Sequence, residues 1–438
     1  MNTPKLVSGK LPLVGHLFDF IRKQDELMQR GKKEEGDIFA LNLMGQNIAV
    51  LTGADAKKVF FQETDKSLNM EEAYAFLAAI FGKVAFLADH ETYMNHRPIL
   101  HTLFSRNRMT TYLDIMVEVV SAWLENLGDE GEMEISSEII TLVKDVAGRS
   151  FLGNEINQKL GEEFWQAYDD LSKALDPVLP PNLPLPKFIR RDKAKKYLAN
   201  VLHLIVRERR ANPKDDSFQM LVEAKMKDGQ LPSEEIIVQL LMALLFAGHE
   251  TTAGQAAWTI IQLAQHPDYL NLVREEVDVL LGDGQIFDHT TLRNLKHVSM
   301  AVDETSRMRP SAETIMRTAD EDLKIGEVTI PKGWMVQTAT AVDHFEDEIF
   351  ENPANYDPMR FSPKRAEERK ERHAIIAFGG GLHKCAGINF ANTEMAVIAA
   401  LLFKEYDLTL ITTDTKVERG LGSSRPSETW VHYKKRKA

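Results

Sequence analysis

The sequence predicts a mainly α-helical fold with a small β-rich lobe, and three observations support this prediction. Residues 110–230 carry the apolar spacing of several successive helices. Residues 233–266 form one long apolar pattern that stops at a proline. Short β-rich runs occur near the start of the chain, over 38–51, and again over 322–338. Helices therefore form most of the body, and the strands gather in a smaller part.

The composition is that of a globular protein, and it excludes some classes of partner. The chain has 438 residues, of which 44% are hydrophobic and 27% charged, so a large core can form. The formal net charge of −12 argues against a nucleic-acid partner, which would need a basic face. No unbroken apolar run reaches the roughly eighteen residues of a membrane helix, and no targeting segment is visible. We therefore expect a soluble, cytoplasmic protein without a membrane anchor.

The first part of the chain predicts a helix, a hairpin and a second helix. Residues 24–34 are rich in Glu, Gln and Lys, as in an exposed helix. The runs 38–43 and 47–51 are separated by a glycine turn, which favours a hairpin. Residues 55–61 carry a short helical pattern, and residues 73–89 are unusually apolar. This last stretch is either a buried helix and turn or a lid over a ligand cavity.

The next segment offers one candidate pair of ligand-binding side chains. Tyr93 and Arg97 are four residues apart, so they share one face of a helix. They form either an exposed pair or contacts to an anionic ligand group, for which Arg is a favoured partner. Residues 110–230 then predict helices and a proline-rich connection over 177–186, without residues that suggest chemistry.

Residues 233–266 predict a long helix that crosses the core. Ser233 suits the N-cap, and Pro267 marks the end of the pattern. The middle of the helix, AGHETT over 247–252, combines small residues with an acid and two hydroxyls, which need partners when buried. Glu250 and Thr251 suit a proton relay beside a flat ligand. The alternative is a helix bend in which Thr251 bonds back to the preceding turn.

Two motifs further along suggest a structural network. Glu304 and Arg307 are three residues apart on a helical pattern, among small and apolar positions, so they can pair. Arg360, in the stretch PMRF, could join them in a buried network. Residues 322–338 alternate and contain Pro and Gly turns, which predicts short strands. The basic residues 434–437 form either an interaction tail or, as we expect, a solvated end.

The single cysteine of the chain, Cys385, lies in the stretch FGGGLHKCAG over 378–387. One cysteine cannot form an internal disulfide or a thiolate zinc cage, but it can be an axial ligand of haem iron. A glycine-rich backbone lets N–H groups approach the sulfur, and the helical pattern 389–397 would bring a positive helix end near it. The alternative is a small buried hydrophobic residue, the usual fate of a free cysteine.

Four motifs together resemble the cytochrome P-450 family in order and spacing, and the similarity runs from about Val7 to Val431. They are the cysteine loop Phe-x-x-Gly-x-(Arg/His)-x-Cys-x-Gly, AGHETT over 247–252, Glu304-x-x-Arg307, and Pro358-x-Arg360-Phe361. Within the family, the stretches that resemble the bacterial sterol 14α-demethylase branch are 74–89, 246–258, 315–319 and 381–385. The resemblance implies the P-450 fold and one domain over 1–438, and the chain ends too soon for a fused reductase or ferredoxin domain.

The resemblance implies a role for each matching residue. Cys385 would be the thiolate ligand of haem b, with Phe378, Gly381 and Gly387 around it. Glu250 and Thr251 would deliver protons to bound dioxygen. A structural network behind the haem would contain Glu304, Arg307 and Arg360. The residues expected at the haem propionates are Tyr74, Tyr93, Arg97, Arg317 and His383. The residues expected to line the substrate pocket are Phe76, Leu77, Phe81, Phe86, Met242, Ala243, Phe246, Ala247, Ile315 and Met316.

The implied activity is insertion of one oxygen atom from dioxygen into a C–H bond of an apolar substrate, with water as the second product. A sterol or triterpenoid is expected first, and a fatty acid or another terpenoid next. Sterol demethylases usually have His-Thr-Ser where this chain has Glu250-Thr251-Thr252, and often Pro where Ala79 stands. Tyr93 stands where most of the wider family has Trp or His. A peroxide-driven enzyme of the same fold and a non-catalytic haem or lipid carrier are the remaining alternatives.

The resemblance also implies a separate electron donor. Electrons would come from NAD(P)H through a ferredoxin or flavodoxin with its reductase. Basic residues near the cysteine, Lys364, Arg365 and Lys384, could dock an acidic donor, a hypothesis that rests on charge alone.

Overall fold

A computed structural model describes residues 2–437 except 154–156, 158, 177–178, 180–182, 283–284 and 421–422. The chain divides into two compact units. The first, here the sheet unit, comprises Met1–Ala75, Phe86–His90 and Ala312–Cys385. The second, here the helical unit, comprises Phe76–Ala85, Glu91–Ser311 and Ala386–Ala438. That residues 1–438 form one domain stays a prediction.

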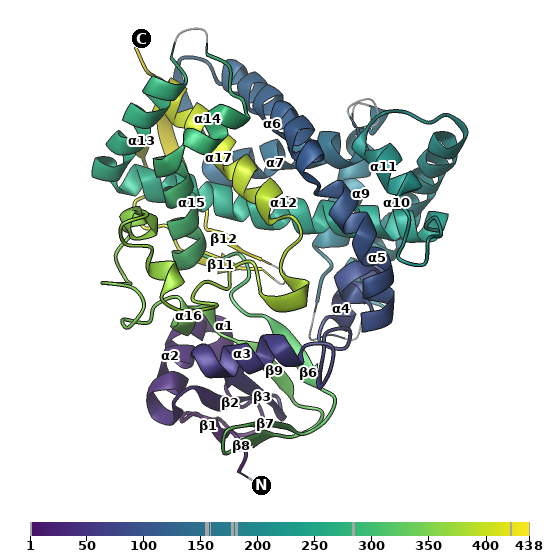
Figure 1. The fold of residues 1–438 in the computed structure, drawn as a ribbon, viewed down its shortest axis with the longest axis vertical. Helices are drawn as coiled ribbons and strands as arrows, with labels where there is room; N and C mark the ends of the chain where they lie inside the picture. Colours follow the sequence, from purple (N-terminus) through teal and green to yellow (C-terminus); the bar gives the residue numbers. More distant parts are fainter. Residues whose placement is uncertain are drawn as a thin grey trace. The chain divides into compact units, whose positions relative to one another are not determined.

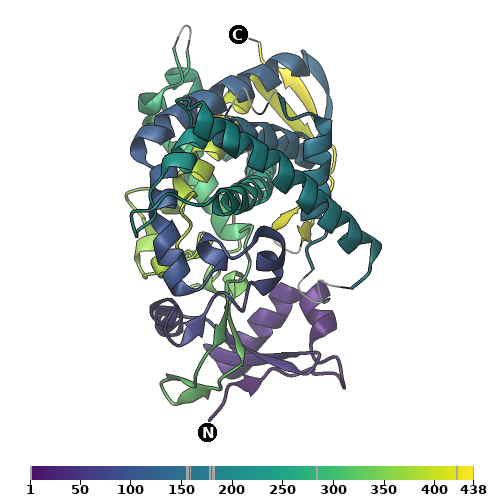
Figure 2. The ribbon, with the colours of Figure 1, turned by 90° about the vertical axis from the view of Figure 1, so that its right-hand side faces the viewer.

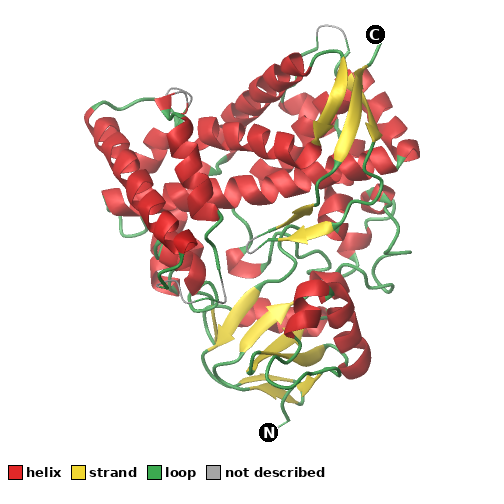
Figure 3. Cartoon of the chain, turned by 180° about the vertical axis from the view of Figure 1, so that it is seen from behind, coloured by secondary structure: helices red, strands yellow, loops and turns green. Residues whose placement is uncertain are grey.

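The sheet unit is built on a six-stranded mixed sheet with the strand order β1-β2-β3-β9-β6-β4 (Figures 1 and 3). The hairpin that the sequence predicted is present at its centre, with the register Ile38↔Leu51 to Leu43↔Gln46. The strands are β1 (Lys5–Leu6), β2 (Ile38–Leu43), β3 (Gln46–Leu51), β4 (Leu68–Asn69), β6 (Met316–Ala319) and β9 (Met335–Thr338). A two-stranded sheet, β7 (Leu323–Ile325) with β8 (Val328–Ile330), matches the predicted short strands.

Short helices complete the sheet unit. The predicted helices over 24–34 and 55–61 are confirmed as α2 (Gln24–Glu35) and α3 (Ala54–Glu63). Helix α2 is less exposed than expected, because Leu27 and Met28 pack against the sheet in a core that includes Phe39. The other helical pieces are α1 (Leu17–Arg22), α16 (Thr340–Asp343), η2 (Pro358–Phe361), η3 (Glu367–Arg369) and η4 (Gly381–His383).

The helical unit surrounds α12 (Glu234–Gln265), and Figure 2 looks along this helix. The Ser233 hydroxyl accepts a hydrogen bond from the Ile236 N–H at 3.2 Å, so the predicted N-cap is confirmed. Helix α12 packs against α7 (Ile135–Leu152), α15 (Lys296–Met308) and α17 (Ile388–Glu405). The long helices are α5 (His90–Leu103), α6 (Arg106–Leu127), α7 (Ile135–Leu152), α9 (Glu162–Ser172), α10 (Pro186–Ala211), α13 (Pro267–Leu280), α15 (Lys296–Met308) and α17 (Ile388–Glu405). The short ones are α4 (Ala75–Phe81), η1 (Ala85–Leu87), α11 (Ser217–Glu223) and α14 (His289–Asn294).

Among the helices of the described chain, only α12 is long and apolar enough to cross a membrane by length and composition. Buried residues make up 56% of its most apolar window. A helix that is apolar on all sides is also what the centre of a large core requires.

Two expectations for the helical unit were wrong or incomplete. Residues 110–230 include a strand as well as helices, β5 (Glu130–Glu134), which pairs with β13 (Trp430–Lys435) beside β10 (Tyr406–Leu410). Its alternating glutamates do not resemble a strand, and its partner lies near the other end of the sequence.

The basic residues 434–437 are not simply solvated, because the Arg436 guanidinium forms an ion pair with Asp278 at 2.7 Å. The remaining strands are β11 (Val417–Arg419) and β12 (Ser424–Pro426). Part of the predicted connection 177–186 lies outside the described residues.

Candidate active site

Cys385 ends a tight turn that only glycine accommodates easily. Gly379 and Gly381 have φ values of +70° and +65°, which are unfavourable for other residues. The Cys385 N–H donates to the Phe378 carbonyl at 2.9 Å and closes the turn. The cysteine itself is exposed within the described structure, unlike a typical structural cysteine. The turn therefore presents the thiol instead of packing it away.

The turn lies directly on α3. A Cβ atom added at Gly381 would be 3.1 Å from the Phe61 carbonyl oxygen, which is closer than ordinary van der Waals contact. A Cβ atom at Gly380 would be 3.0 Å from ring atoms of both Phe61 and His373. These two rings pack against each other with centroids 4.6 Å apart. The glycines are thus needed both for the backbone conformation and for this close approach.

A buried lysine contacts the His373 segment, whose ring packs on Phe61 beside the glycine turn. The fully buried Lys57 ammonium donates to the His373 carbonyl at 3.1 Å and lies 3.3 Å from the Asp343 carboxylate. Glu371 is a second acidic partner of Lys57 at 3.1 Å. Burial raises the pKa of Asp343 to about 7, although Lys57 and the Gly53 N–H favour its charged form. Sequence reasoning missed this cluster, because its members are scattered over more than 300 positions.

His383 interacts with a carboxylate in the described structure. Its Nε2 lies 2.6 Å from Asp65, which also lies 2.9 Å from Nδ1 of His90. Burial would raise the pKa of Asp65, but the hydrogen bonds with the two histidines outweigh it and lower the pKa. Asp65 is a second residue that the sequence reasoning missed, since a lone Asp after a helix suggests only a turn.

Arg317 is the most informative of the predicted propionate ligands. Its guanidinium is buried, donates to the Thr64 hydroxyl at 3.2 Å and the Met316 carbonyl at 2.6 Å, and lies 5.1 Å from the Phe60 ring. It forms no ion pair with a carboxylate of the described residues. Burial lowers the pKa of Arg317, although the charge of Asp65 partly opposes this. A buried cation without a counter-ion suits an anionic ligand group.

The remaining candidates for propionate contacts fall in two places. In the sheet unit, the Tyr74 hydroxyl accepts a hydrogen bond from the Met316 N–H at 3.1 Å, which brings Tyr74 next to Arg317 in the fold. In the helical unit, Tyr93 is buried and Arg97 half-buried, and both lie on α5 as expected. Gly387, also in the helical unit, is the N-cap of α17.

The acid–alcohol segment over 247–252 lies within the continuous helix α12 and adds a side-chain hydrogen bond to it. The Thr251 hydroxyl donates to the Ala247 carbonyl at 2.7 Å, as the helix-bend alternative predicted. The Thr251 carbonyl accepts from the Ser311 hydroxyl at 2.8 Å. This back-bond occupies the hydroxyl proton but leaves the oxygen able to accept another, so a relay role stays a prediction.

Glu250 lies beside the buried imidazole of His249. The carboxylate is half-buried, and its Oε1 lies 3.6 Å from Nε2 of His249. The other ring nitrogen of His249 lies 3.4 Å from the Tyr168 hydroxyl. Burial lowers the pKa of His249, although the charge of Glu250 opposes this.

Several predicted pocket residues meet in the helical unit. The Phe81 and Phe246 rings, from α4 and α12, have centroids 4.9 Å apart. Leu77 and Phe81 are buried, so residues 75–81 correspond to the buried-helix alternative. Also in this unit are Phe76, Met242, Ala243 and Ala247, whereas Phe86, Ile315 and Met316 belong to the sheet unit.

The two halves of the predicted structural network are each well formed. Glu304 and Arg307 are completely buried and form a two-point ion pair, with N–O distances of 2.7 and 2.9 Å. Arg360, in the sheet unit, is also completely buried and pairs with Glu367 at 2.8 Å. Arg360 donates as well to the carbonyls of Glu351 at 3.0 Å and Asn355 at 3.2 Å. Glu367 was not predicted.

These features define a class of protein. An exposed cysteine on a glycine turn suits an iron ligand, and a buried arginine without a counter-ion suits the propionate of a macrocycle. The residues present therefore fit a haem held through sulfur. The family model for cytochrome P450 matches residues 4–428, and the chain belongs to the cytochrome P-450 family.

The chain is similar along most of its length to sterol demethylases. It is 32% identical to the sterol 14α-demethylase of Mycolicibacterium vanbaalenii, covering 92% of this chain and 90% of that protein. It is 29% identical to the sterol 14-demethylase of Arabidopsis thaliana, covering 99% and 91% of the two chains. Among solved structures, the retinoic acid bound cyanobacterial CYP120A1 matches with a TM-score of 0.88 and 25% identity, covering 99% of each chain.

The protein is accordingly a cytochrome P-450 monooxygenase with the P-450 fold predicted from its sequence. Its family uses haem and dioxygen, receives electrons from a redox partner and acts on apolar substrates.

Proposed function

We propose that the protein oxidises a sterol or triterpenoid in the manner of a 14α-demethylase. The observation that carries this proposal is the similarity to bacterial and plant sterol demethylases over more than nine-tenths of the chain. The apolar ring pair Phe81–Phe246 supports it, because a large hydrophobic substrate needs an aromatic, water-poor pocket.

In this proposal the cofactor is haem b, and Cys385 is its thiolate ligand. The haem would supply the activation of dioxygen, and Cys385 would hold its iron through sulfur and donate electron density to it. The glycine turn fixes the direction of the Cys385 sulfur. Arg317, Tyr74 and His383, which all belong to the sheet unit, would bind a propionate.

Glu250 and Thr251 would handle the protons. The Thr251 oxygen, whose own proton is held by the Ala247 carbonyl, would accept a hydrogen bond from a water. The half-buried Glu250 carboxylate can take up protons from solvent and pass them inward. Met242, Ala243 and Phe246 would line the apolar side of this segment and exclude further water.

A second candidate substrate class is a smaller terpenoid or a fatty acid. Glu250 and Thr252 stand where sterol demethylases usually have His and Ser, and Ala79 stands where they often have Pro. The retinoic acid bound neighbour, similar in fold and 25% identical, binds an apolar isoprenoid acid. These observations favour testing terpenoid and fatty acids beside sterols.

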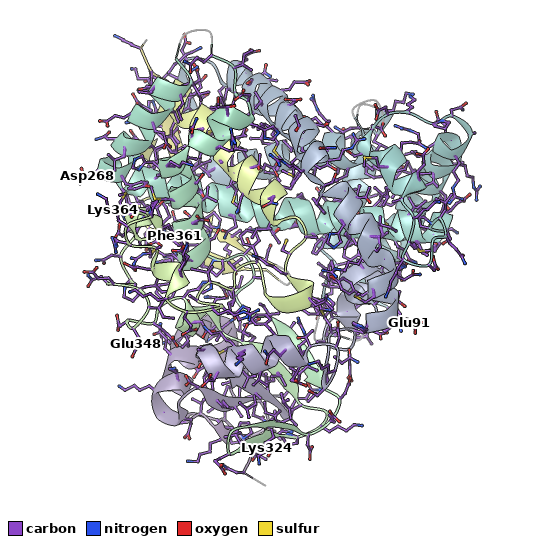
Figure 4. The ribbon with its side chains drawn as sticks, viewed as in Figure 1. Glu91, Asp268, Lys324, Glu348, Phe361 and Lys364 are labelled. Atoms are coloured by element: carbon purple, nitrogen blue, oxygen red, sulfur yellow. The ribbon has the colours of Figure 1, made fainter. Side chains whose placement is uncertain are left out.

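The proposed electron donor is a ferredoxin or flavodoxin, reduced by NAD(P)H through its reductase. Lys364, labelled in Figure 4, and Lys384 are exposed and could contact an acidic donor. Arg365 is a weaker candidate than the sequence suggested, because it pairs with Asp357 at 2.5 Å and Glu367 at 2.6 Å. If Lys384→Glu leaves the salt dependence of reduction unchanged, Lys384 has no docking role.

The test is a substrate panel assayed with the haem-loaded protein and isotopically labelled dioxygen. The panel pairs each 14α-methyl sterol with its 14-desmethyl counterpart and adds terpenoid and fatty acids. We expect a spin-state change with the methylated sterol and loss of its methyl carbon as formic acid after three successive oxygenations, each using one dioxygen and two electrons from the donor, with labelled oxygen recovered in the formic acid. Turnover of an acid alone would favour the second candidate. Faster turnover with hydrogen peroxide than with NAD(P)H and a donor would favour a peroxide-driven enzyme, and binding without any product would favour a carrier.

A further inference from the structure

The turn that follows α3 contacts two of the predicted propionate ligands at consecutive positions. Phe61, in the last turn of α3, lies against the cysteine turn. Three residues later, the Thr64 hydroxyl accepts a hydrogen bond from the Arg317 guanidinium at 3.2 Å. The next residue is Asp65, whose carboxylate lies 2.6 Å from Nε2 of His383. All of these residues belong to the sheet unit.

Thr64 connects Arg317 to the end of the helix. Thr64 is buried, and its hydroxyl donates to the Phe60 carbonyl at 2.9 Å while it accepts from Arg317. The Phe60 ring lies 5.1 Å from the same guanidinium. A buried guanidinium with a hydrogen-bond acceptor and an aromatic ring on fixed backbone has little freedom to turn. The last turn of α3 therefore helps to determine the direction of the Arg317 side chain.

Asp65 has a backbone conformation that few residues accept. Its φ is +66°, in the left-handed region, where Asp and Asn are enriched among the residues other than glycine. Its N–H donates to the Leu68 carbonyl at 2.8 Å, which closes the turn. An aspartate that served the turn alone could point into solvent. The Asp65 side chain is instead only 8% exposed and contacts two imidazoles, those of His383 and His90.

The two histidines on Asp65 differ in exposure and in place. The His90 side chain is 52% exposed, whereas that of His383 is 2% exposed and lies in the cysteine loop, two residues before Cys385. Because Nε2 of His383 is engaged by Asp65, a contact of His383 with a propionate can use only Nδ1. The carboxylate therefore determines which edge of the His383 imidazole is presented to a ligand.

We infer that Asp65 is a positioning residue for haem binding, which holds the His383 imidazole in the orientation that meets a propionate. Its neighbour Thr64 orients Arg317 toward the same group. The role of Asp65 rests on the proposed assignment of His383 and Arg317 as propionate ligands, and it does not depend on which substrate the enzyme oxidises. Side chains that orient a metal-ligating histidine contribute about ten- to a hundredfold to metal affinity, and we expect the lower end of this range for a histidine that binds a propionate.

The test is the rate at which the loaded protein transfers haem to excess apomyoglobin, compared with haem whose two propionates are methyl esters. Asp65→Gly accepts the left-handed backbone and removes the carboxylate, so we expect about tenfold faster loss of haem. Asp65→Asn keeps an oxygen that can accept from His383, and should restore part of the retention. Loss of the dimethyl ester should change by less than about twofold in both variants, because the ester offers His383 no anionic partner.

Asp322→Asn is the matched control, because Asp322 accepts the Lys332 N–H at 2.9 Å in another turn of the sheet unit. It should leave both rates unchanged. Asp65 has no positioning role if Asp65→Gly retains haem like the wild type, or if it loses haem and the ester faster by the same factor, as a purely structural turn residue would.

His383→Gln separates this outcome from a failure of the propionate assignment. If His383→Gln speeds the loss of haem but not of the ester, and Asp65→Gly does not, only the role of Asp65 is wrong. If His383→Gln affects haem and ester alike, His383 is not a propionate ligand, and the positioning role of Asp65 is wrong with it.

Discussion

The cysteine turn and the acid–alcohol segment hold their reactive groups by different physical means. In the turn, the position of Cys385 depends on backbone angles that favour glycine and on contact with Phe61. In α12, Thr251 sits in an ordinary helix and is oriented by one side-chain hydrogen bond to Ala247. The first arrangement fails when the backbone changes. The second is altered by side-chain substitutions that leave the fold intact, so the two should be separable by experiment.

Arg307→Leu should have the largest effect on stability, because it leaves the buried Glu304 carboxylate without its ion-pair partner. We expect a loss of about 3–5 kcal/mol in the free energy of unfolding, with loss of bound haem. Urea unfolding and the haem-to-protein ratio measure the two effects. Arg207→Leu is the control, since its pair with Glu234 lies near the surface and should contribute far less to stability. Equal losses in both variants would contradict a structural role specific to the buried pair.

The stability that the buried Lys57 cluster provides should depend on pH through Asp343. Its pKa is raised to about 7 in the folded protein, so the folded state holds this proton more tightly than the unfolded chain. Stability from this group is therefore full below about pH 4 and is lost as the pH rises through 7.

The free energy of unfolding should fall by roughly 2 kcal/mol more in the wild type than in Asp343→Asn between about pH 5 and 7. Chemical unfolding at each pH measures it. The exposed Asp414→Asn should keep the wild-type pH dependence. If Asp343→Asn keeps it too, Asp343 is ionised throughout and the ion pair with Lys57 dominates.

Gly381→Ala should test whether backbone conformation places the sulfur. A left-handed alanine costs roughly 1–2 kcal/mol, and its Cβ would also press on Phe61. We expect reduced haem retention and a smaller thiolate-type absorption band. Gly326→Ala is the matched control, because Gly326 has φ +57° and no atom within 4 Å of an added Cβ. It should cost similar stability and leave the haem spectrum unchanged; a spectral change in both variants would remove the special role of the turn.

Thr251→Ala should change stability least and chemistry most selectively. We expect NAD(P)H consumption to continue, product per NAD(P)H to fall at least about tenfold, and hydrogen peroxide to rise. Thr259→Ala is the control on the same helix, since the Thr259 hydroxyl makes the same kind of back-bond, to Gln255 at 2.8 Å. Unchanged coupling in Thr251→Ala, or equal uncoupling in both variants, would leave Thr251 with the helix-bend role alone.

Local patterns predicted much of this molecule. The hairpin over 38–51, the cap at Ser233 and the Glu304–Arg307 pair depend on neighbours in sequence, and all three are confirmed. Strand β5 could not be predicted, because its pairing with β13 spans about 300 residues. Asp65 and the Lys57 cluster were missed for the same reason. Glu367 lies only seven residues from Arg360, but the sequence does not show that both side chains are buried. A carboxylate or ammonium in a sequence does not reveal whether the fold will bury it, and only tertiary packing decides its partners.

The most direct test of the cysteine assignment is the carbon monoxide difference spectrum of the dithionite-reduced protein. It should be recorded for the wild type, Cys385→Ala and Thr251→Ala. A strongly red-shifted Soret band in the wild type and Thr251→Ala, lost in Cys385→Ala, would establish a thiolate-ligated haem at Cys385. A band at the position of histidine-ligated haem in the wild type, or an unchanged band in Cys385→Ala, would contradict it.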